Sequence, residues 1–478
     1  MSYRASVPAS LPAQSDPSTE RPAASDSAPG STLDTRRPTD GVATTGGFGR
    51  AGSTIGSTGL HNPTGRTRLA LAFLLAMLGA LGPLNIDMYL PSFPEISTDL
   101  RASPSMVQLS LTACLIGLAI GQVIVGPISD AEGRRRPLAL FLLLFAAASL
   151  LCALAPNVGI LVAARFLQGL TASAGIVISR AVIRDVFTGS NITKFFALMM
   201  AINATAPMIA PMAGGLILAL PFASWHLVFL VLAAVGLLIT LVVTLRLPET
   251  LPVERRVPAS SRNSLSTMGQ LLRDRSFVPY AIIVGVVQGG TFAYVAGTPF
   301  IYQDIYQVSP QVFSVLFGIN GIAIILGNLI VGRASGWIRE RTLLRTGILC
   351  AFAATAVILA TALTTGPLPM LVAALWIYMC SMGLVTTSAF TLAMRNQSHR
   401  AGAASGVMGT FPLAIGSLAA PLVGLDDSSA APMGLIMFTT ASLGTLAFFL
   451  LSRRDRSEVS TYVPGATPTP ERAEPTIR

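Results

Sequence analysis

Long apolar runs alternate with short polar or charged connections along most of the chain. The runs are rich in Leu, Ala, Val, Ile and Gly, and each has about the 20 residues that a helix needs to cross the hydrocarbon core of a bilayer. The pattern predicts an all-α membrane protein with twelve membrane-spanning helices, at residues 69–93, 105–128, 137–155, 158–184, 195–220, 226–247, 276–302, 311–333, 343–363, 367–394, 403–424 and 432–452.

The twelve segments form two groups of six, separated by the long polar stretch 248–275. Short motifs recur between the groups: GQVIVG at 121–126 resembles GNLIVG at 327–332, and APMAGG at 210–215 resembles APLVGL at 420–425. Such repeats are typical of transporters whose substrate site lies between two related halves. We expect two six-helix bundles related by pseudo-twofold symmetry. The expected parts are an N-terminal bundle at 66–247, a cytoplasmic linker loop at 248–275 and a C-terminal bundle at 276–452.

The two ends of the chain differ from the rest in composition. Residues 1–65 consist mainly of Ser, Thr, Pro, Gly and Ala, and Tyr3 and Phe48 are their only aromatic residues. Such a segment cannot bury enough apolar surface to offset its ordering entropy, and it has no apolar core of the kind found in signal peptides. Residues 453–478 are similar. We expect both ends to be disordered cytoplasmic tails.

Composition agrees with a membrane protein and indicates its orientation. Of the 478 residues, 52% are hydrophobic and only 11% are charged, and the mean hydropathy is +0.65. The net charge of +10 comes from arginines clustered in the connections on one side of the predicted spans. The positive-inside rule then predicts that both termini are cytoplasmic. The abundance of Arg is typical of a high-GC bacterium, so we expect a multi-pass protein of a bacterial cytoplasmic membrane.

Several functions are disfavoured by what the sequence does not contain. The four cysteines lie inside apolar runs, which predicts packing roles rather than disulfides or a metal site. No phosphate-binding Gly-x-x-x-x-Gly-Lys-Ser/Thr loop and no basic face with interleaved aromatics is present, which argues against ATP-driven transport and nucleic-acid binding. We expect no enzyme activity, no cofactor and no metal, and a monomer.

The connection after the second predicted span reads GPISDAEGRRRPL. It resembles the Gly-x-x-x-Asp-x-x-Gly-Arg-Arg signature of the major facilitator superfamily, which implies a conformational latch at the cytoplasmic surface. We expect the first glycine to let two helices approach closely and the aspartate to accept hydrogen bonds. Ala131 replaces the usual arginine, so one arm of the charge network is missing or is supplied by another residue. A simple positive-inside loop with a tight turn is the alternative. The latch residues are Gly126, Asp130, Gly133, Arg134 and Arg135.

Two further segments resemble motifs of the same superfamily. LVAARFLQGLTASAGIVISR in the fourth span matches its Arg-x-x-Gln-Gly pattern with Arg165, Gln168 and Gly169. NATAPMIAPMAGGLIL in the fifth span resembles its antiporter motif, a proline- and glycine-bent helix that implies an exporter, although the leading Gly-x-x-x-Gly is absent. The predicted helix-bend residues are Pro207, Pro211, Gly214 and Gly215.

Two stretches resemble one particular branch of the superfamily. DMYLPSFPEI at 87–96 and AGTPFIYQDIYQVSPQVFSVLFGIN at 296–320 are similar to the bicyclomycin-resistance (Bcr/CflA) type of drug:proton antiporter. The resemblance implies twelve helices, alternating access and export of drug-like molecules against proton entry.

Asp87 and Arg165 are the ionisable residues that the predicted spans place well inside the membrane. Intramembrane charges are costly and usually functional. Burial favours the protonated form of a lone carboxyl, whereas a nearby arginine favours the ionised form. We therefore predict that Asp87 is the proton-coupling residue, which binds a proton and a substrate alternately, with Arg165 as its partner. A permanent Asp87–Arg165 ion pair that only fixes helix packing is the alternative.

The remaining predicted site is mainly apolar and aromatic, which favours a lipophilic, neutral or weakly cationic substrate rather than a sugar. A proton-coupled metabolite importer of the same fold and a non-transporting membrane sensor are the alternative functions. The predicted substrate-binding residues are Asp87, Tyr89, Gln168, Gln288, Phe292 and Tyr294.

Overall fold

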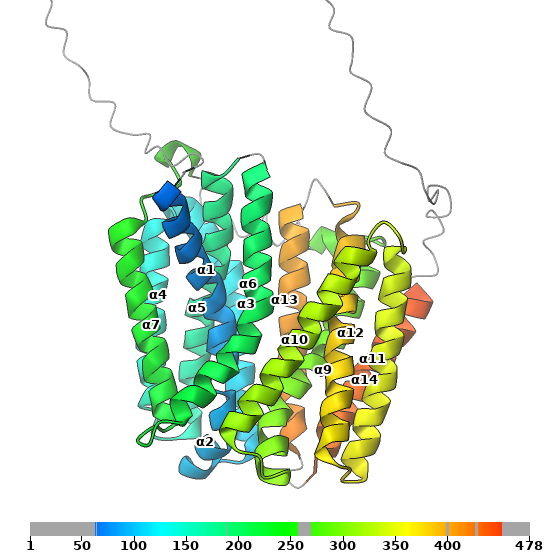
Figure 1. Cartoon of the computed structure of the whole chain (residues 1–478). Helices are drawn as coiled ribbons and strands as arrows, with labels where there is room; N and C mark the ends of the chain where they lie inside the picture. Colours follow the sequence, from blue (N-terminus) through cyan, green and yellow to red (C-terminus); the bar gives the residue numbers. More distant parts are fainter. Residues whose placement is uncertain are drawn as a thin grey trace, which may run out of the picture. The chain divides into compact units, whose positions relative to one another are not determined.

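The computed structural model describes residues 63, 65–188, 190–256, 269–397, 401–425 and 429–451, and within this part of the chain every regular element is helical (Figure 1). The predicted tails, apart from residues 63 and 65, lie outside the described residues, as does part of the predicted linker loop, residues 257–268.

The predicted spans are confirmed as helices, and most of their ends agree to within a few residues. Eleven of the described helices are long and apolar enough to cross a membrane, and α6 contributes the shorter apolar stretch Thr205–Leu218. The first half contains α1 (Gly65–Asp87), α3 (Pro104–Glu132), α4 (Arg135–Ala153), α5 (Val158–Val186), α6 (Ser190–Leu218) and α7 (Trp225–Arg246). The second half contains α9 (Val278–Phe300), α10 (Pro310–Ala334), α11 (Glu340–Leu363), α12 (Leu368–Met394), α13 (Ala401–Ala419) and α14 (Ala431–Leu451).

The start of the second helix in each half repeats the same local structure. Ser103 precedes Pro104 and accepts a hydrogen bond from the backbone N–H of Met106, and Ser309 precedes Pro310 in the same way. A serine N-cap followed by proline at the first helical position is a strong helix start, because proline lacks the N–H that would be unsatisfied there. The two halves therefore share a capping device as well as the motifs that recur in the sequence.

The first predicted span is not one helix, which corrects the expectation of a continuous segment over 69–93. Helix α1 ends at Asp87, and the chain continues as a short 3-10 turn, η1 (Leu90–Ser92), and a separate helix, α2 (Phe93–Asp99). Pro91 explains the break, because a proline inside a helix lacks a hydrogen-bond donor and clashes with the carbonyl four residues earlier. That carbonyl belongs to Asp87, which therefore lies at a helix terminus.

Helices pack in corresponding pairs within the two halves. Helix α3 packs against α5 in the first half as α10 packs against α12 in the second, and α4 contacts α7 as α11 contacts α14 (Figure 1). Between the halves, α6 contacts α10, and α3 contacts α13 and the 3-10 turn η5 (Ala420–Leu425). Helices α6 and α10 are the fifth and eighth spans, and α3 and α13 are the second and eleventh. A pseudo-twofold axis that exchanges the halves would exchange these two contacts, so the packing agrees with such symmetry.

Hydrogen bonds between the halves lie at the end of the bundle where α3 begins and α9 ends. Gln108 donates to the carbonyl of Ala296 over 3.1 Å, and Ser105 donates to the carbonyl of Gly424. Of the two glycines of the fifth span, Gly215 lies at this interface, because a Cβ there would collide with the hydroxyl of Ser314 on α10, whereas a Cβ at Gly214 would collide with the carbonyl of Met88 within the first half. Helix α6 runs through Pro207 and Pro211. The role of Gly214 is thus close approach, and a helix bend at these prolines stays a prediction.

Glycines also permit the helix crossings within each half. A Cβ at Gly117 of α3 would collide with the carbonyl of Phe166 on α5, and one at Gly327 of α10 would collide with the carbonyl of Cys380 on α12. Gly126 was expected to serve such a crossing, and this expectation is wrong. A Cβ there would meet only a methyl group of Val177 at 3.9 Å, which is ordinary van der Waals contact.

We expect Gly117→Ala to destabilise the protein and Gly126→Ala not to. Alanine at position 117 forces α3 away from α5, and overpacking of this kind costs about 1–3 kcal/mol. At position 126 the better helix propensity of alanine, about 1 kcal/mol, meets no clash. Thermal unfolding of the detergent-purified variants checks this difference. Equal melting temperatures for the two variants would show that the crossing does not depend on Gly117.

Candidate functional site

A cavity of about 180 Å³ lies between the two halves of the chain. Both halves contribute to it, and most of its wall is apolar or aromatic. Asp87 is the only acidic or basic residue among those that line it. The lining residues are Pro83, Ile86 and Asp87 of α1, Pro207 of α6, Gln288, Thr291, Phe292, Tyr294 and Val295 of α9, Phe317, Asn320, Gly321 and Ile324 of α10, and Met379 of α12.

Asp87 reaches this cavity from the last position of α1. Its side chain is buried, and it forms no hydrogen bond or ion pair with any residue that the structure describes. An isolated carboxylate is so costly in a low-dielectric site that such a group generally takes up a proton instead. The position is therefore suited to a group that exchanges a proton.

Arg165 of α5 is fully buried and lies beside α1. Its guanidinium donates to the side-chain oxygen of Asn85 over 2.8 Å, to the backbone oxygen of Asn85 over 2.9 Å and to Gln168 over 2.5 Å. It also stacks on the ring of Tyr89, 4.1 Å from the ring centre. Among the described residues it forms no ion pair with Asp87, so the alternative of a permanent Asp87–Arg165 pair is not what this structure contains.

The helical period explains why Arg165 binds Asn85 and not Asp87. Residues two apart on an α-helix project about 200° apart, so Asn85 faces α5 while Asp87 faces the cavity. The carbonyl of Asn85 is one of the last four in α1, which lack partners within the helix. A cation at this end also interacts favourably with the helix dipole. Arg165 therefore caps the carboxyl end of α1.

Tyr89 and Gln168 belong to the surroundings of Arg165 and do not line the cavity. Gln168 donates to Ser149 over 2.7 Å, and the hydroxyl of Tyr89 lies 3.2 Å from that of Ser110. Both were grouped with the substrate-binding residues from the sequence. In this structure they hold Arg165. Asn85, which the sequence analysis missed, completes the cluster. It could have been noticed as a polar amide within the apolar run of the first predicted span.

Gln288, Phe292 and Tyr294, predicted from the sequence to bind substrate, do line the cavity. Asn320 of α10 donates to the hydroxyl of Tyr294 over 3.0 Å, and the Tyr294 ring stacks on Phe317 with centres 5.1 Å apart. Asn320 was not predicted, although an amide inside an apolar span is a recognisable signal of function. The cavity thus combines an aromatic wall with a few fixed polar groups.

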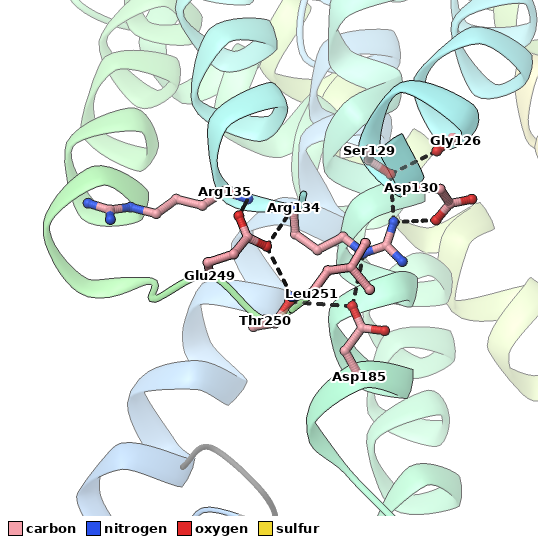
Figure 2. A network of polar contacts seen from close by, with 9 residues as sticks. All are labelled: Gly126, Ser129, Asp130, Arg134, Arg135, Asp185, Glu249, Thr250 and Leu251. Carbon is pink, nitrogen blue, oxygen red and sulfur yellow. Dashed lines mark hydrogen bonds and ion pairs between the residues drawn. The ribbon is translucent and has the colours of Figure 1, made fainter. Parts of the chain in front are cut away.

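A second polar cluster lies where α3 connects to α4 (Figure 2). Arg134 donates to Asp185 of α5 over 2.9 Å, to Asp130 over 2.5 Å and to the hydroxyl of Ser129 over 2.9 Å. Burial alone lowers the pKa of the Arg134 guanidinium. The hydrogen bonds and negative charges of Asp185 and Asp130 outweigh this effect, so its pKa lies above the usual value. Arg134 therefore remains charged at physiological pH.

Glu249, just after α7, binds the backbone of the same connection. It accepts hydrogen bonds from the N–H groups of Arg134 over 2.7 Å and Arg135 over 3.2 Å (Figure 2). Gly133 has a φ of +99°, and a Cβ there would come within 2.6 Å of the Glu249 carboxylate. A glycine is required at this position for both reasons. The guanidinium of Arg135 instead donates to the carbonyl of Thr244 on α7.

The sequence analysis did not identify Asp185 and Glu249. It noted that Ala131 replaces an arginine of the motif and left open whether another residue compensates. Asp185 and Glu249 extend the charge network beyond the loop itself. The signal was available, because both lie beside the membrane ends of predicted spans on the arginine-rich side. A role of this cluster as a latch stays a prediction.

Comparisons with known proteins agree with this architecture. The family model of the Major Facilitator Superfamily matches residues 69–421. The chain is 62% identical over 394 residues to YdgK, an uncharacterized MFS-type transporter of Bacillus subtilis, across 82% of this chain and 98% of that protein. It is 30% identical over 383 residues to a bicyclomycin resistance protein homolog of Haemophilus influenzae, across 80% of this chain and 96% of that protein.

A solved structure shows the same fold. The partially occluded inward-open xylose transporter XylE of E. coli aligns with a TM-score of 0.64 and 13% sequence identity, over 80% of this chain and 97% of that chain. At this identity the likeness concerns the fold alone.

We expect Arg134→Gln to lower the free energy of unfolding by about 2 kcal/mol, because it removes the charge-assisted hydrogen bonds to Asp185 and Asp130. Arg135→Gln is the matched control. Its side chain is exposed, so its removal should cost less than about 1 kcal/mol. Thermal and denaturant unfolding in detergent would measure both. A loss for Arg135→Gln as large as that for Arg134→Gln would contradict this account of the cluster.

Proposed function

Because this chain belongs to the Major Facilitator Superfamily, we propose that it exports lipophilic, neutral or weakly cationic drug-like molecules in exchange for protons. It is a multi-pass membrane transporter and not an enzyme. The similarity to a bicyclomycin resistance protein homolog supports a drug-like substrate. The single observation that carries the proposal is the buried carboxyl of Asp87 in a cavity shared by both halves.

The wall of the cavity supports the proposed substrate class. Phe292, Tyr294 and Phe317 offer aromatic surface, whereas Gln288, Thr291 and Asn320 offer a few hydrogen-bonding groups. Apolar pockets with a small number of placed polar groups suit lipophilic ligands. Aromatic faces and one carboxylate also suit a weakly cationic ligand. A sugar would need more hydrogen-bonding partners than these.

Exchange of a substrate for a proton requires only that both ligands compete for the ionised carboxylate of Asp87. When Asp87 is protonated, it is neutral and a cationic substrate gains nothing from it. When substrate or water enters and the proton leaves, the carboxylate can attract a cation. Binding of either ligand then weakens binding of the other by the same factor, which is the thermodynamic basis of antiport.

The proposed transport cycle moves residues 66–247 against residues 276–452. In the described part of the chain, the Gln108–Ala296 and Ser105–Gly424 hydrogen bonds join the halves at the end opposite the start of α1. The arginine distribution favours a cytoplasmic start of α1, so we infer an inward-facing arrangement in a bacterial cytoplasmic membrane with both termini inside. The latch cluster (Gly126, Asp130, Gly133, Arg134 and Arg135) would then stabilise one access state of a monomer.

Within this proposal, Arg165 is a positioning residue and acts through Asn85. Its two bonds to Asn85 fix the last turn of α1, and hence the direction in which Asp87 points. Gln168 accepts a hydrogen bond from Arg165, and the ring of Tyr89 packs against its guanidinium.

Proton flux in inverted membrane vesicles that are acidic inside would test the function. We expect tetraphenylphosphonium, a lipophilic cation, to collapse the pH gradient and to accumulate inside vesicles with the wild-type protein but not with Asp87→Asn. Asp304→Asn is the control, because Asp304 is an acid outside the Asp87 cavity. Equal flux in wild type and Asp87→Asn would remove Asp87 from proton coupling. Drug-independent flux together with metabolite release from the vesicles would indicate an importer.

Arg165→Lys should reduce drug-driven proton flux about tenfold or more, because lysine keeps the charge but cannot bind both oxygens of Asn85. Asn85→Ala should act in the same direction. Arg184→Lys, at an exposed position in the last turn of the same helix, should leave the flux unchanged. Size-exclusion profiles would verify folding. Normal flux in a folded Arg165→Lys protein would show that the two hydrogen bonds from Arg165 to Asn85 do not position Asp87.

A further inference from the structure

A second hollow lies in the first half, between α1 and α7. It has a volume of about 530 Å³ and lies where α1 begins and α7 ends. Apolar side chains form most of its wall, including Leu74 and Met77 of α1 and Ile239 and Val242 of α7. We propose that this groove binds one anionic phospholipid. The proposal does not depend on which molecule the protein transports.

The length of the groove fits an acyl chain. Leu74 and Ile239 are buried and form its floor. From Arg66 at the mouth to Met77 at the inner end, α1 rises about 16 Å. This is about half of the roughly 30 Å hydrocarbon core of a bilayer, so the groove runs from the membrane surface to mid-depth. One leaflet of lipid occupies the same depth.

The charge at the mouth fits a phosphate headgroup. Arg66 from α1 and Arg246 from α7 both line the groove, and both side chains are exposed. Within the described part of the chain, neither forms an ion pair with an acidic residue. Guanidinium groups bind phosphate oxygens in a bidentate manner. Basic pockets between membrane helices on the cytoplasmic side commonly hold anionic lipid headgroups.

The neighbouring arginine provides a contrast. Arg68 lies two residues from Arg66, but its guanidinium lies 3.5 Å from the side-chain oxygen of Asn191 and 5.6 Å from the ring centre of Phe195. Both of those residues belong to α6. Arg68 therefore faces another helix and does not line the groove, although it carries the same charge at nearly the same depth.

Native mass spectrometry of the full-length, detergent-purified protein would test the proposal. The probes are phosphatidylglycerol and phosphatidylcholine with identical acyl chains, and glycerol phosphate as the headgroup without chains. We expect preferential retention of phosphatidylglycerol, about fivefold weaker binding for Arg66→Gln or Arg246→Gln, and a larger loss for the double variant. Arg68→Gln should bind as the wild type does.

Ala70→Trp tests the apolar part separately, because it fills the groove without changing its charge. We expect it to lose phosphatidylglycerol, with a normal melting temperature as evidence of folding. Equal binding of the two lipids, or an equal loss with Arg68→Gln, would overturn the proposal. Displacement of the lipid by glycerol phosphate at comparable concentration would also overturn it, because it would indicate a site for soluble phosphate.

Discussion

A fully buried guanidinium that forms no ion pair with any described carboxylate is the constraint on which the first half of this protein depends. The charge of Arg165 is stabilised by the side-chain amide oxygen and the helix-terminal carbonyl of Asn85 and by the aromatic ring of Tyr89. A buried charge is tolerated only when such partners satisfy it, so helices α1 and α5 must keep their relative position. The same bonds leave the carboxyl of Asp87 without an ion-pair partner among the described residues. The neighbouring cavity can therefore contain a titratable group that is not consumed by a structural ion pair.

The break in the first span and the pairing of the halves together create that cavity. Pro91 ends α1 at Asp87, and the chain turns away before α2 begins. Close contacts of α6 with α10 and of α3 with η5 bring the two halves together at one end. The carboxyl of Asp87 then faces α9 and α10 across the interface. Movement of one half against the other would change what Asp87 faces without changing the packing around Arg165.

The sequence predicted the helices well because spans in a bilayer must be long and apolar, which is visible without tertiary information. Cavity residues on α9 were also predictable, because Gln288, Phe292 and Tyr294 are polar or aromatic side chains within an apolar span. The sequence could not show that Asn85, rather than Asp87, binds Arg165. These two residues point to nearly opposite sides of α1, and only the structure shows which side faces α5. Nor could it show that Gly126 has open space beside it, or that Glu249 accepts hydrogen bonds from the backbone of the loop after α3. These features arise only when segments far apart in the chain meet.

Proton release on substrate binding to the purified protein tests the central claim most directly. In weakly buffered detergent solution, saturating tetraphenylphosphonium should release protons from the wild-type protein, detected with a pH indicator. Asp87→Asn, saturated with the same compound, should release none. An unchanged release from Asp87→Asn would contradict the claim that proton and substrate compete for Asp87.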